Sequence, residues 1–258
     1  MWQDAGDPRV DSYPLLSGGP WKVLTICLLY VLFAKYWGPK LMKGKKAWDC
    51  RRAMVIHNML LIALNGVGCL LGLLFTNFGR DAWSCKRLDT ADRSYKSYVL
   101  INLGYLYFMT KFVDFLDTVF FVLRKKESHI TGLHVFHHAI MPLTGWTGCK
   151  FFPGGNSALT PLVNTFVHTV MYSYYLCSAL EVPPEKYMHL KRRITEIQLI
   201  QFTLVLGHSL YSLFNPYCEW PRLMAMAELA EAVTFLKLFS TFYKRTYLTK
   251  KESAIKSK

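Results

Sequence analysis

The chain has 258 residues, of which 52% are hydrophobic and 15% aromatic, and it carries a formal net charge of +14. Its apolar residues are gathered into runs of about twenty, the length that crosses a bilayer as a helix, rather than spread as a soluble core requires. The basic residues lie mainly in short segments between those runs and are not interleaved with aromatic residues on soluble elements, which argues against nucleic-acid binding.

The first twenty residues are polar, acidic and rich in turn-forming residues. They lack the order of basic, apolar and small residues that marks a cleavable signal peptide. We therefore expect membrane insertion to depend on the first membrane helix itself.

Seven apolar segments that are long enough to span a membrane follow in chain order. No internal repeat, low-complexity tract or long linker separates them, so the chain is predicted to be a single membrane-embedded domain, residues 1–258, of the all-α class. The third and fourth segments also carry charged residues. The predicted spans are residues 21–37, 54–76, 97–123, 133–151, 157–180, 194–214 and 222–243.

The connecting segments predict an orientation. Segments 38–53, 124–132, 181–193 and 244–258 hold about 19 of the 31 Lys and Arg residues, whereas the alternate segments hold about 6. Positively charged loops face the cytosol. An odd number of spans then places the N-terminus in the lumen and the C-terminus in the cytosol, although segment 77–96 has five basic residues of its own.

Two cysteines, Cys85 and Cys218, fall in separate segments that this orientation places in the lumen, where a disulfide persists. A bridge between them would clamp two helix hairpins together. Two alternatives stay open: both thiols are free, or Cys149, close to the lumenal end of its span, pairs with one of them. The other cysteines lie in or near spans or in a cytosolic loop: Cys27, Cys50, Cys69 and Cys177.

The segment HVFHH places His134, His137 and His138 at positions i, i+3 and i+4, which share one face of a helix. Ionisable groups inside a membrane are costly and by default indicate function. A single buried histidine would more often be structural, but three on one stripe favour a reactive site.

A second stripe follows in the next span, HTVMYSYY, where His168, Met171, Tyr172 and Tyr175 share a face. An aromatic stripe alone usually indicates packing between helices. The leading histidine favours a site instead, because it can meet the first cluster from a neighbouring helix.

Two further polar motifs lie in other spans. In KFVDFLDT, Asp114, Asp117 and Thr118 share a helix face, and the carboxylates are expected to pair or to orient histidines. In TEIQLIQ, Gln198 and Gln201 are directed inward, with ordinary interhelical hydrogen bonding as the alternative. The predicted orientation puts all four motifs in the cytosolic half of the membrane.

With these motifs the chain resembles the very-long-chain fatty acid elongase family, the 3-ketoacyl-CoA synthases of the endoplasmic reticulum. The likeness covers nearly the whole chain, including the NPYCEWP segment and the closing FYKRTY. One position departs from the family pattern: this chain has Asp114 where the family often has Glu. Asp keeps the negative charge, but its side chain has a shorter reach. The matching motifs are HVFHH at 134–138, HTVMYSYY at 168–175, KFVDFLDT at 111–118 and TEIQLIQ at 195–201.

The resemblance implies an enzyme that condenses a fatty acyl-CoA with malonyl-CoA, giving a 3-ketoacyl-CoA, carbon dioxide and CoA. It implies seven membrane helices in the endoplasmic reticulum, six of them enclosing an acyl-chain tunnel, and no cofactor or metal. The partners it implies are the two CoA substrates, the bilayer and the other enzymes of the elongation cycle, namely ketoacyl reductase, dehydratase and enoyl reductase. A homodimer is a further candidate, and the oligomeric state and acyl preference are left open.

As proposed for the family, His137 is expected to attack the thioester and to carry the acyl group as an acyl-imidazole. His168 would polarise the thioester or assist decarboxylation, while His134 and His138 would orient groups or relay protons, supported by Asp117. Hydroxyl and amide groups are expected to stabilise the enolate: those of Tyr172, Tyr175, Gln198 and Gln201. The cations expected to bind CoA at the cytosolic mouth are Lys111, Arg124, Lys191 and Arg192, although the general excess of positive charge in cytosolic loops explains the last three equally well.

Two other classes of protein share parts of this pattern. A membrane di-iron desaturase or hydroxylase also uses histidine boxes, but only one dense box occurs in this chain. A lipid transporter or lipid-binding receptor also buries polar groups, but transporters often show repeated halves and broken spans. Pro142 and Pro161 lie within spans, yet no halves match. The remaining histidines form no paired spacing: His57, His129, His189 and His208.

The C-terminal tail KRTYLTKKESAIKSK is expected to face the cytosol and to help retain the protein in the endoplasmic reticulum. Lys256 lies third from the end, as in dilysine retrieval signals, but Ala254 stands where the second lysine would be. A solvated basic tail without a signal is the alternative.

Overall fold

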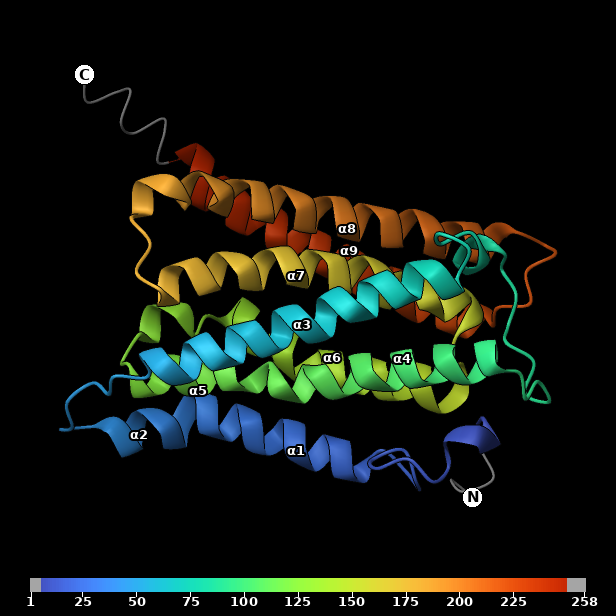
Figure 1. Ribbon diagram of the computed structural model, residues 1–258, viewed down its shortest axis with the longest axis horizontal. Coiled ribbons are helices and arrows are strands. Elements are labelled where there is room, and N and C mark those ends of the chain that lie inside the picture. Colours follow the sequence, from blue (N-terminus) through green and yellow to red (C-terminus); the bar gives the residue numbers. More distant parts are fainter. Residues whose placement is uncertain (1–5, 250–258) are drawn as a thin grey trace.

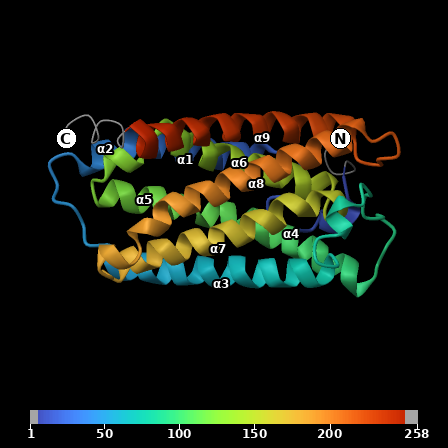
Figure 2. The same cartoon turned by 90° about the horizontal axis from the view of Figure 1, so that it is seen from above.

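The fold of residues 6–249, the part of the chain that the computed structural model describes, is an all-helical bundle (Figure 1). Its long helices run along one axis and remain close to parallel when the molecule is turned (Figure 2). The all-α prediction is therefore confirmed. Lys256 and the retrieval signal predicted around it lie outside the described residues.

Within the described residues, seven helical rods follow one another. The loops between them alternate between the two ends of the bundle (Figure 1). In residues 6–249, three stretches are long and apolar enough to cross a membrane: Trp21–Met42, Arg51–Phe75 and Met188–Phe214. The chain is therefore a multi-pass membrane protein. The first rod consists of α1 (Trp21–Leu32), a π-helical segment (Phe33–Trp37) and α2 (Gly38–Met42). The others are α3 (Arg51–Phe75), α4 (Tyr95–Val113) with α5 (Phe115–Leu123), α6 (Gly132–Phe151), α7 (Leu159–Ala179), α8 (Met188–Phe214) and α9 (Arg222–Tyr243).

The predicted spans coincide with these rods, with differences at their ends. The first rod runs to Met42 rather than to residue 37, and the third is interrupted at Asp114. Helix α8 begins at Met188 rather than at residue 194, so Lys191 and Arg192 belong to a helix and not to a loop. Hydropathy cannot detect this first turn, because a helix that rises out of a membrane carries polar residues there.

The residues near the starts of α6 and α7, the helices that carry the histidines of the two motifs, explain where these helices begin. The hydroxyl of Thr131 accepts a hydrogen bond from the backbone N–H of His134 (3.2 Å), and this cap starts α6 just before the HVFHH motif. Pro161 lies in the first turn of α7, where its missing N–H removes no intrahelical bond. Pro142 lies inside α6, which continues on both sides of it. Neither proline breaks its helix.

Six of the rods are consecutive neighbours around the bundle. Helix α6 packs against α4, α4 against α3, α3 against α7, α7 against α8, and α8 against α9. Helices α9 and α6 meet through Phe235, whose ring centroid lies 5.9 Å from that of Phe136 and 5.2 Å from that of His137. The first rod packs on α6 through α1 and on α5 through α2.

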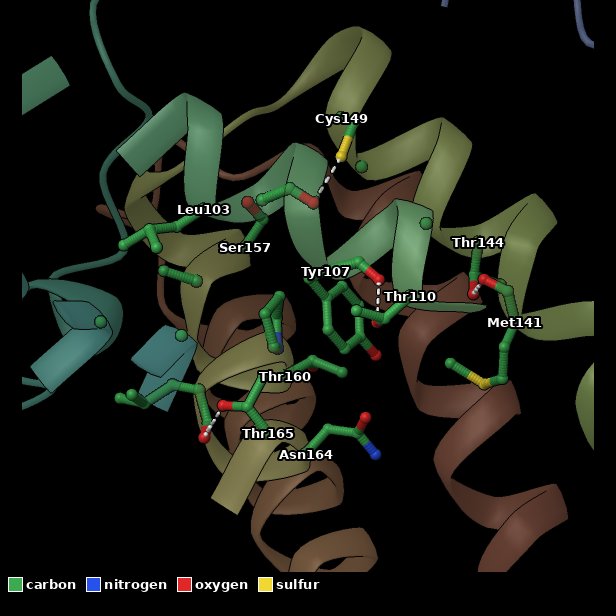
Figure 3. Close-up of a pocket in the computed structure, with 18 of the residues that line it drawn as sticks. Leu103, Tyr107, Thr110, Met141, Thr144, Cys149, Ser157, Thr160, Asn164 and Thr165 are labelled. Carbon is green, nitrogen blue, oxygen red and sulfur yellow. Dashed lines mark hydrogen bonds between the residues drawn. The ribbon is translucent and has the colours of Figure 1, made fainter. Parts of the chain in front are cut away.

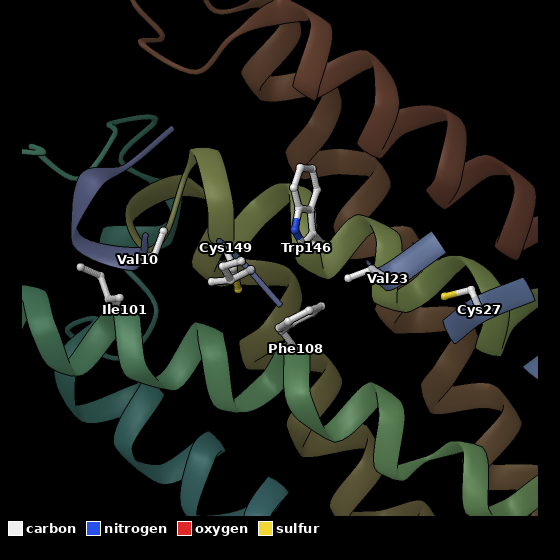
Figure 4. Packing of buried hydrophobic residues seen from close by; sticks show 8 residues of the cluster. Val10, Val23, Cys27, Ile101, Phe108, Trp146 and Cys149 are labelled. Carbon is white, nitrogen blue, oxygen red and sulfur yellow. The ribbon is translucent and has the colours of Figure 1, made fainter. Parts of the chain in front are cut away.

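The segment before α1 covers one end of α4 and α6. The backbone N–H of Asp7 donates to the carbonyl of Lys150 (2.8 Å), and the buried Arg9 pairs with Asp7 (2.5 Å) and donates to the hydroxyl of Ser97 (2.7 Å). These contacts satisfy polar groups that would otherwise be buried without partners. The apolar cluster beneath them joins Val10, Leu16, Val23, Cys27, Ile101, Phe108, Trp146 and Cys149 (Figure 4).

A disulfide joins Cys85, between α3 and α4, to Cys218, between α8 and α9. The backbone N–H of Glu219 donates to the carbonyl of Cys85 (3.0 Å), which holds the two loops together beside the bridge. Cys149, the competing partner, is a free thiol that donates to the carbonyl of Gly104 (3.2 Å). The bridge therefore ties one helix hairpin to the other, at the end of the bundle opposite the start of α6.

Candidate active site

A cavity of about 250 Å³ lies where α6 and α8 begin and where α5, α7 and α9 end. Residues from all four polar motifs, far apart in the sequence, line this one space. The structure thus gathers all nine residues that the sequence analysis expects to be catalytic: His134, His137, His138, His168, Asp117, Tyr172, Tyr175, Gln198 and Gln201.

The three histidines of α6 lie side by side. The ring centroids of His134 and His138 are 4.3 Å apart, and those of His137 and His138 are 5.4 Å apart. Nε2 of His134 lies 2.7 Å from the hydroxyl oxygen of Thr118, which lies 2.9 Å from the hydroxyl oxygen of Tyr30. This chain of contacts from α6 through α5 to α1 fixes the orientation of the His134 ring. Within residues 6–249, no three His, Cys, Asp or Glu side chains are grouped so that they could hold a metal ion.

The carboxylates of Asp114 and Asp117 share the hydroxyl of Tyr172. Its oxygen lies 3.0 Å from Oδ1 of Asp114 and 2.8 Å from Oδ2 of Asp117, and its single proton serves one carboxylate at a time. Nζ of Lys111 lies 3.2 Å from Oδ2 of Asp114 and donates to Oδ1 of Asn164 (3.1 Å). The cluster is buried, so these partners replace water in holding the negative charge.

Lys111 is therefore a counter-ion inside the bundle, and its predicted place at the cytosolic mouth needs correction. Its side chain is 2% exposed, and its ammonium lies 4.5 Å from the ring centroid of Tyr107. It stands roughly 18 Å along the rod from the end of α5 at Leu123, taking 1.5 Å per helical residue. The physical reason is the spacing to Asp114, three residues on, which gives the lysine a partner on its own helix face.

His57 of α3 also belongs to this cluster, although its position in the sequence, outside the four polar motifs, did not predict a place at the site. Its Nε2 lies 3.1 Å from Oδ1 of Asp117, and its ring meets that of Tyr172 edge-on, with centroids 5.9 Å apart. The residue is 5% exposed, and its Nδ1 has no partner in the part of the chain that the structure describes. The available signal was an ionisable residue inside a long apolar helix.

Several polar atoms around the cavity are free for a ligand. Nδ1 of His168 lies 3.8 Å from Oδ2 of Asp114, which is too far for a hydrogen bond. Neither this Nδ1 nor Oε1 of Gln201 has a partner among residues 6–249. The amide nitrogen of Gln198 lies 3.8 Å from the sulfur of Met171. Buried polar groups of this kind call for hydrogen bonds that a bound substrate can supply.

One of the predicted CoA-binding cations, Lys191, lines the cavity. Burial, and then the positive charges of Lys191, Lys126 and Arg124, lower the pKa of His129, which lies in the connection between α5 and α6. Cations from two parts of the chain, the α5–α6 connection and the start of α8, thus act on the same histidine just before α6 begins.

Arg192 is engaged within the protein rather than turned to the cavity. Its Nε lies 2.9 Å from Oε1 of Glu196 and donates to the hydroxyl of Tyr243 (2.9 Å). Arg193 binds the other carboxylate oxygen of Glu196 (2.9 Å). Glu196 therefore balances much of this charge, and Arg192 joins α8 to α9.

A second cavity, of about 170 Å³, continues from the first toward the opposite end of the bundle. Figure 3 shows side chains of α4, α6 and α7 around it, and its lining is mainly apolar. The two cavities share four lining residues: His137, Asn164, Gln201 and Phe202. The first cavity, called the polar cavity below, is lined largely by histidine, tyrosine and glutamine side chains. The second, called the apolar cavity, is lined mostly by aliphatic and small residues, and His137 is its one histidine among the described residues. His137 thus stands at the junction between the two.

A multi-pass helical bundle with clustered histidines between a polar and an apolar cavity is typical of a membrane enzyme that acts on a substrate with a lipid chain. The chain belongs to the GNS1/SUR4 (ELO) family, which matches residues 15–255.

Its relatives include a very long chain fatty acid elongase of Aedes aegypti, 36% identical over 249 residues, which are 94% of this chain and 67% of the relative. Very long chain fatty acid elongase 7 of Drosophila melanogaster is 36% identical over 257 residues, which cover 96% of this chain and 76% of the relative. Very long chain fatty acid elongase 4 of Homo sapiens is 37% identical over 243 residues, which cover 93% of this chain and 76% of the relative. The family resemblance is confirmed.

Proposed function

We propose that this protein catalyses the condensation step of fatty acid elongation, joining an acyl-CoA to malonyl-CoA with release of carbon dioxide and CoA. The family and the named relatives support an elongase and do not favour a di-iron desaturase or a lipid transporter. The observation that carries the proposal is the place of His137, which lines both cavities. A thioester carbonyl at His137 would leave the CoA portion in the polar cavity and the acyl chain in the apolar one.

In the first half-reaction, the neutral imidazole of His137 attacks the thioester carbonyl. The carbon–sulfur bond breaks, an acyl-imidazole forms, and the ring proton passes to the thiolate, so that CoA leaves as a thiol. His168, whose Nδ1 is free in the described structure, polarises the carbonyl oxygen. His134 and His138 orient His137 and relay the proton.

In the second half-reaction, malonyl-CoA loses carbon dioxide, and the remaining enolate carbon attacks the acyl-imidazole carbonyl. The carbon–nitrogen bond breaks, giving the 3-ketoacyl-CoA, and the imidazole takes up a proton, so each turnover consumes one proton. Donors that line the cavity stabilise the enolate before it attacks. These are the hydroxyls of Tyr172 and Tyr175 and the amides of Gln198 and Gln201.

The cations near His129 bind the CoA phosphates at the mouth of the polar cavity. Lys191 does so from the cavity wall, and Arg124 and Lys126 do so from beside it. Phosphate groups recruit such cations because each provides several charged acceptor oxygens. The reaction needs no metal or cofactor, since the imidazole and the two thioesters supply all its groups.

All seven rods cross the membrane of the endoplasmic reticulum, and six of them enclose the acyl tunnel. Support comes from the loops, which alternate between the ends of the bundle, and from their charge, because the basic loops share one end with the histidines. The N-terminus is lumenal and the C-terminus cytosolic. The disulfide lies at the other end, which is consistent with an oxidising lumen. The remaining enzymes of the elongation cycle and a second copy of the chain are the proposed partners.

The test is to incubate membranes that carry the protein with malonyl-CoA and a panel of long and very long acyl-CoAs, and to profile the products. We expect 3-ketoacyl products two carbons longer than the substrate, and membranes without the protein serve as the control. Desaturated or hydroxylated products of unchanged length would contradict the proposal.

A further inference from the structure

The apolar cavity carries a polar band at some distance from His137. The hydroxyl of Tyr107, on α4, lines this cavity and has no hydrogen-bond partner in the described part of the chain. The residue is 6% exposed. Figure 3 shows its ring projecting into the space between Met141 on one side and Thr160 and Asn164 on the other. A buried phenol with nothing to bond is uncommon in a folded protein.

Two carboxylic acids face the same space from α9. Glu228 and Glu231 lie three residues apart, on one side of their helix, and both line the cavity. Glu231 and Tyr107 thus line one cavity from two different helices. Within residues 6–249 neither carboxyl group is joined to a cation. Acidic groups at this depth in a membrane are costly and indicate function by default.

A third element contributes an acceptor. The amide of Asn65, on α3, donates to the carbonyl of Leu61 (2.8 Å), but its Oδ1 has no partner among the described residues. Asn65 is fully buried and lines the same cavity. The polar band therefore has free groups on three helices, α3, α4 and α9.

The register of α4 against α6 gives the depth of this band. Phe108, next to Tyr107, packs against Gly145, where an added Cβ would lie 3.2 Å from the Phe108 ring. From His137 to Gly145 the helix rises roughly 12 Å at 1.5 Å per residue. This places the backbone of Tyr107 roughly 12 Å along the bundle from His137. Glu231 is closer, because it lies four residues, or roughly 6 Å, before Phe235 on α9, and the Phe235 ring contacts that of His137. The band therefore flanks a long acyl chain part-way along its length, roughly 6–12 Å from a carbonyl at His137.

A plain methylene chain would leave these groups unpaired, and an unpaired buried polar group costs free energy. A hydroxyl group both accepts, as it would from Tyr107, and donates, as it would to Glu231 or Asn65. We infer that the acyl chain this protein prefers carries a hydroxyl group near its middle. The inference rests on the proposed condensing activity and specifies its substrate class.

The experiment compares acyl-CoAs of one chain length, either unsubstituted or with a single hydroxyl placed near the thioester, near the middle or near the far end. The full-length protein, in membranes, is given malonyl-CoA and each substrate in turn. We expect kcat/KM to be at least about tenfold higher for the mid-chain hydroxyl than for the unsubstituted chain, a ratio that one hydrogen bond supplies. The Tyr107→Phe and Glu231→Gln variants should lose most of this ratio while still extending the unsubstituted chain. Tyr105→Phe is the matched control, because the Tyr105 hydroxyl bonds to Pro14 outside the cavity (3.4 Å).

If kcat/KM is the same for every hydroxyl position and for the unsubstituted chain, the inference is overturned, while the proposed condensing activity is not. Such a result would mean that water satisfies the polar band. A preference that survives both substitutions would also overturn it, because the recognition would then lie elsewhere. No condensation of any acyl-CoA would instead remove the proposed function, and this inference with it.

Discussion

Nε2 of His57 lies 3.1 Å from Oδ1 of Asp117, whose other oxygen lies 2.8 Å from the hydroxyl of Tyr172. His57 and Asp117 come from α3 and α5, sixty positions apart in the chain. Asp117 and Tyr172 line the polar cavity and His57 does not, so the histidine acts on the reaction through these two neighbours. We therefore regard His57 as a positioning residue.

The His57→Phe variant should lower kcat by about tenfold, with little change in KM for the acyl-CoA. Phenylalanine removes the hydrogen-bonding contact with Asp117, so the side chains of Asp117 and Tyr172 are no longer held in position. The His57→Gln variant should recover most of the activity, since its amide can still donate to Asp117. Initial rates with malonyl-CoA at saturation give both constants. His208→Gln is the control, since His208 is equally buried but contacts the carbonyl of Ala82 (2.9 Å) at the far end of the bundle. A Phe variant with unchanged kcat would contradict the role.

Replacing Tyr172 with Phe removes the hydroxyl that Asp114 and Asp117 share. We expect kcat to fall by more than tenfold and the protein to lose about 1–3 kcal/mol of stability, because two buried carboxylates lose a donor. Rates and thermal inactivation midpoints measure the two effects. Tyr13→Phe also loses one hydrogen bond, to Asn102 (2.7 Å), but lies before α1, and it should keep its rate. A Tyr172→Phe enzyme with normal kcat would show that the shared hydroxyl has no part in catalysis.

The Cys85–Cys218 bridge should be recovered intact from membranes that are alkylated before any reduction. Because it closes a long loop, the Cys218→Ser variant should lose about 2–5 kcal/mol of stability and inactivate at a lower temperature. Its rate at low temperature should be near normal, since the bridge lies away from the histidines. Cys177→Ser is the matched control, as Cys177 is a free thiol. Finding both cysteines alkylated without reduction would refute the bridge and weaken the assigned orientation.

A tag placed after residue 258 should be digested when protease is added to intact microsomes, because the proposed orientation puts the basic end of the bundle in the cytosol. A tag before residue 1 should be protected until detergent opens the membrane. The reverse pattern would move the histidines to the lumenal side and contradict the proposed orientation.

The sequence predicted the helices well because each apolar run has the length of a span, and it predicted the histidine stripe because i, i+3 and i+4 share a face. It could not predict contacts between distant helices, which depend on how the rods pack. His57 was therefore missed, since its contact with Asp117 depends on the packing of α3 beside α5. Lys111 was placed at the mouth although its i, i+3 spacing to Asp114 offered a partner, because its contact with Asn164 and its burial depend on how α4 packs beside α7.

The central claim is that His137 carries out the condensation, and the most direct measurement is the rate at which labelled malonyl-CoA enters 3-ketoacyl product in membranes carrying the wild type or His137→Ala. His208→Gln, expressed in parallel, controls for the loss of a buried histidine. The account predicts that wild type and His208→Gln form the two-carbon-longer product, while His137→Ala, at equal abundance in the membrane, forms none above background. Product formation by His137→Ala at a near-normal rate would contradict the account.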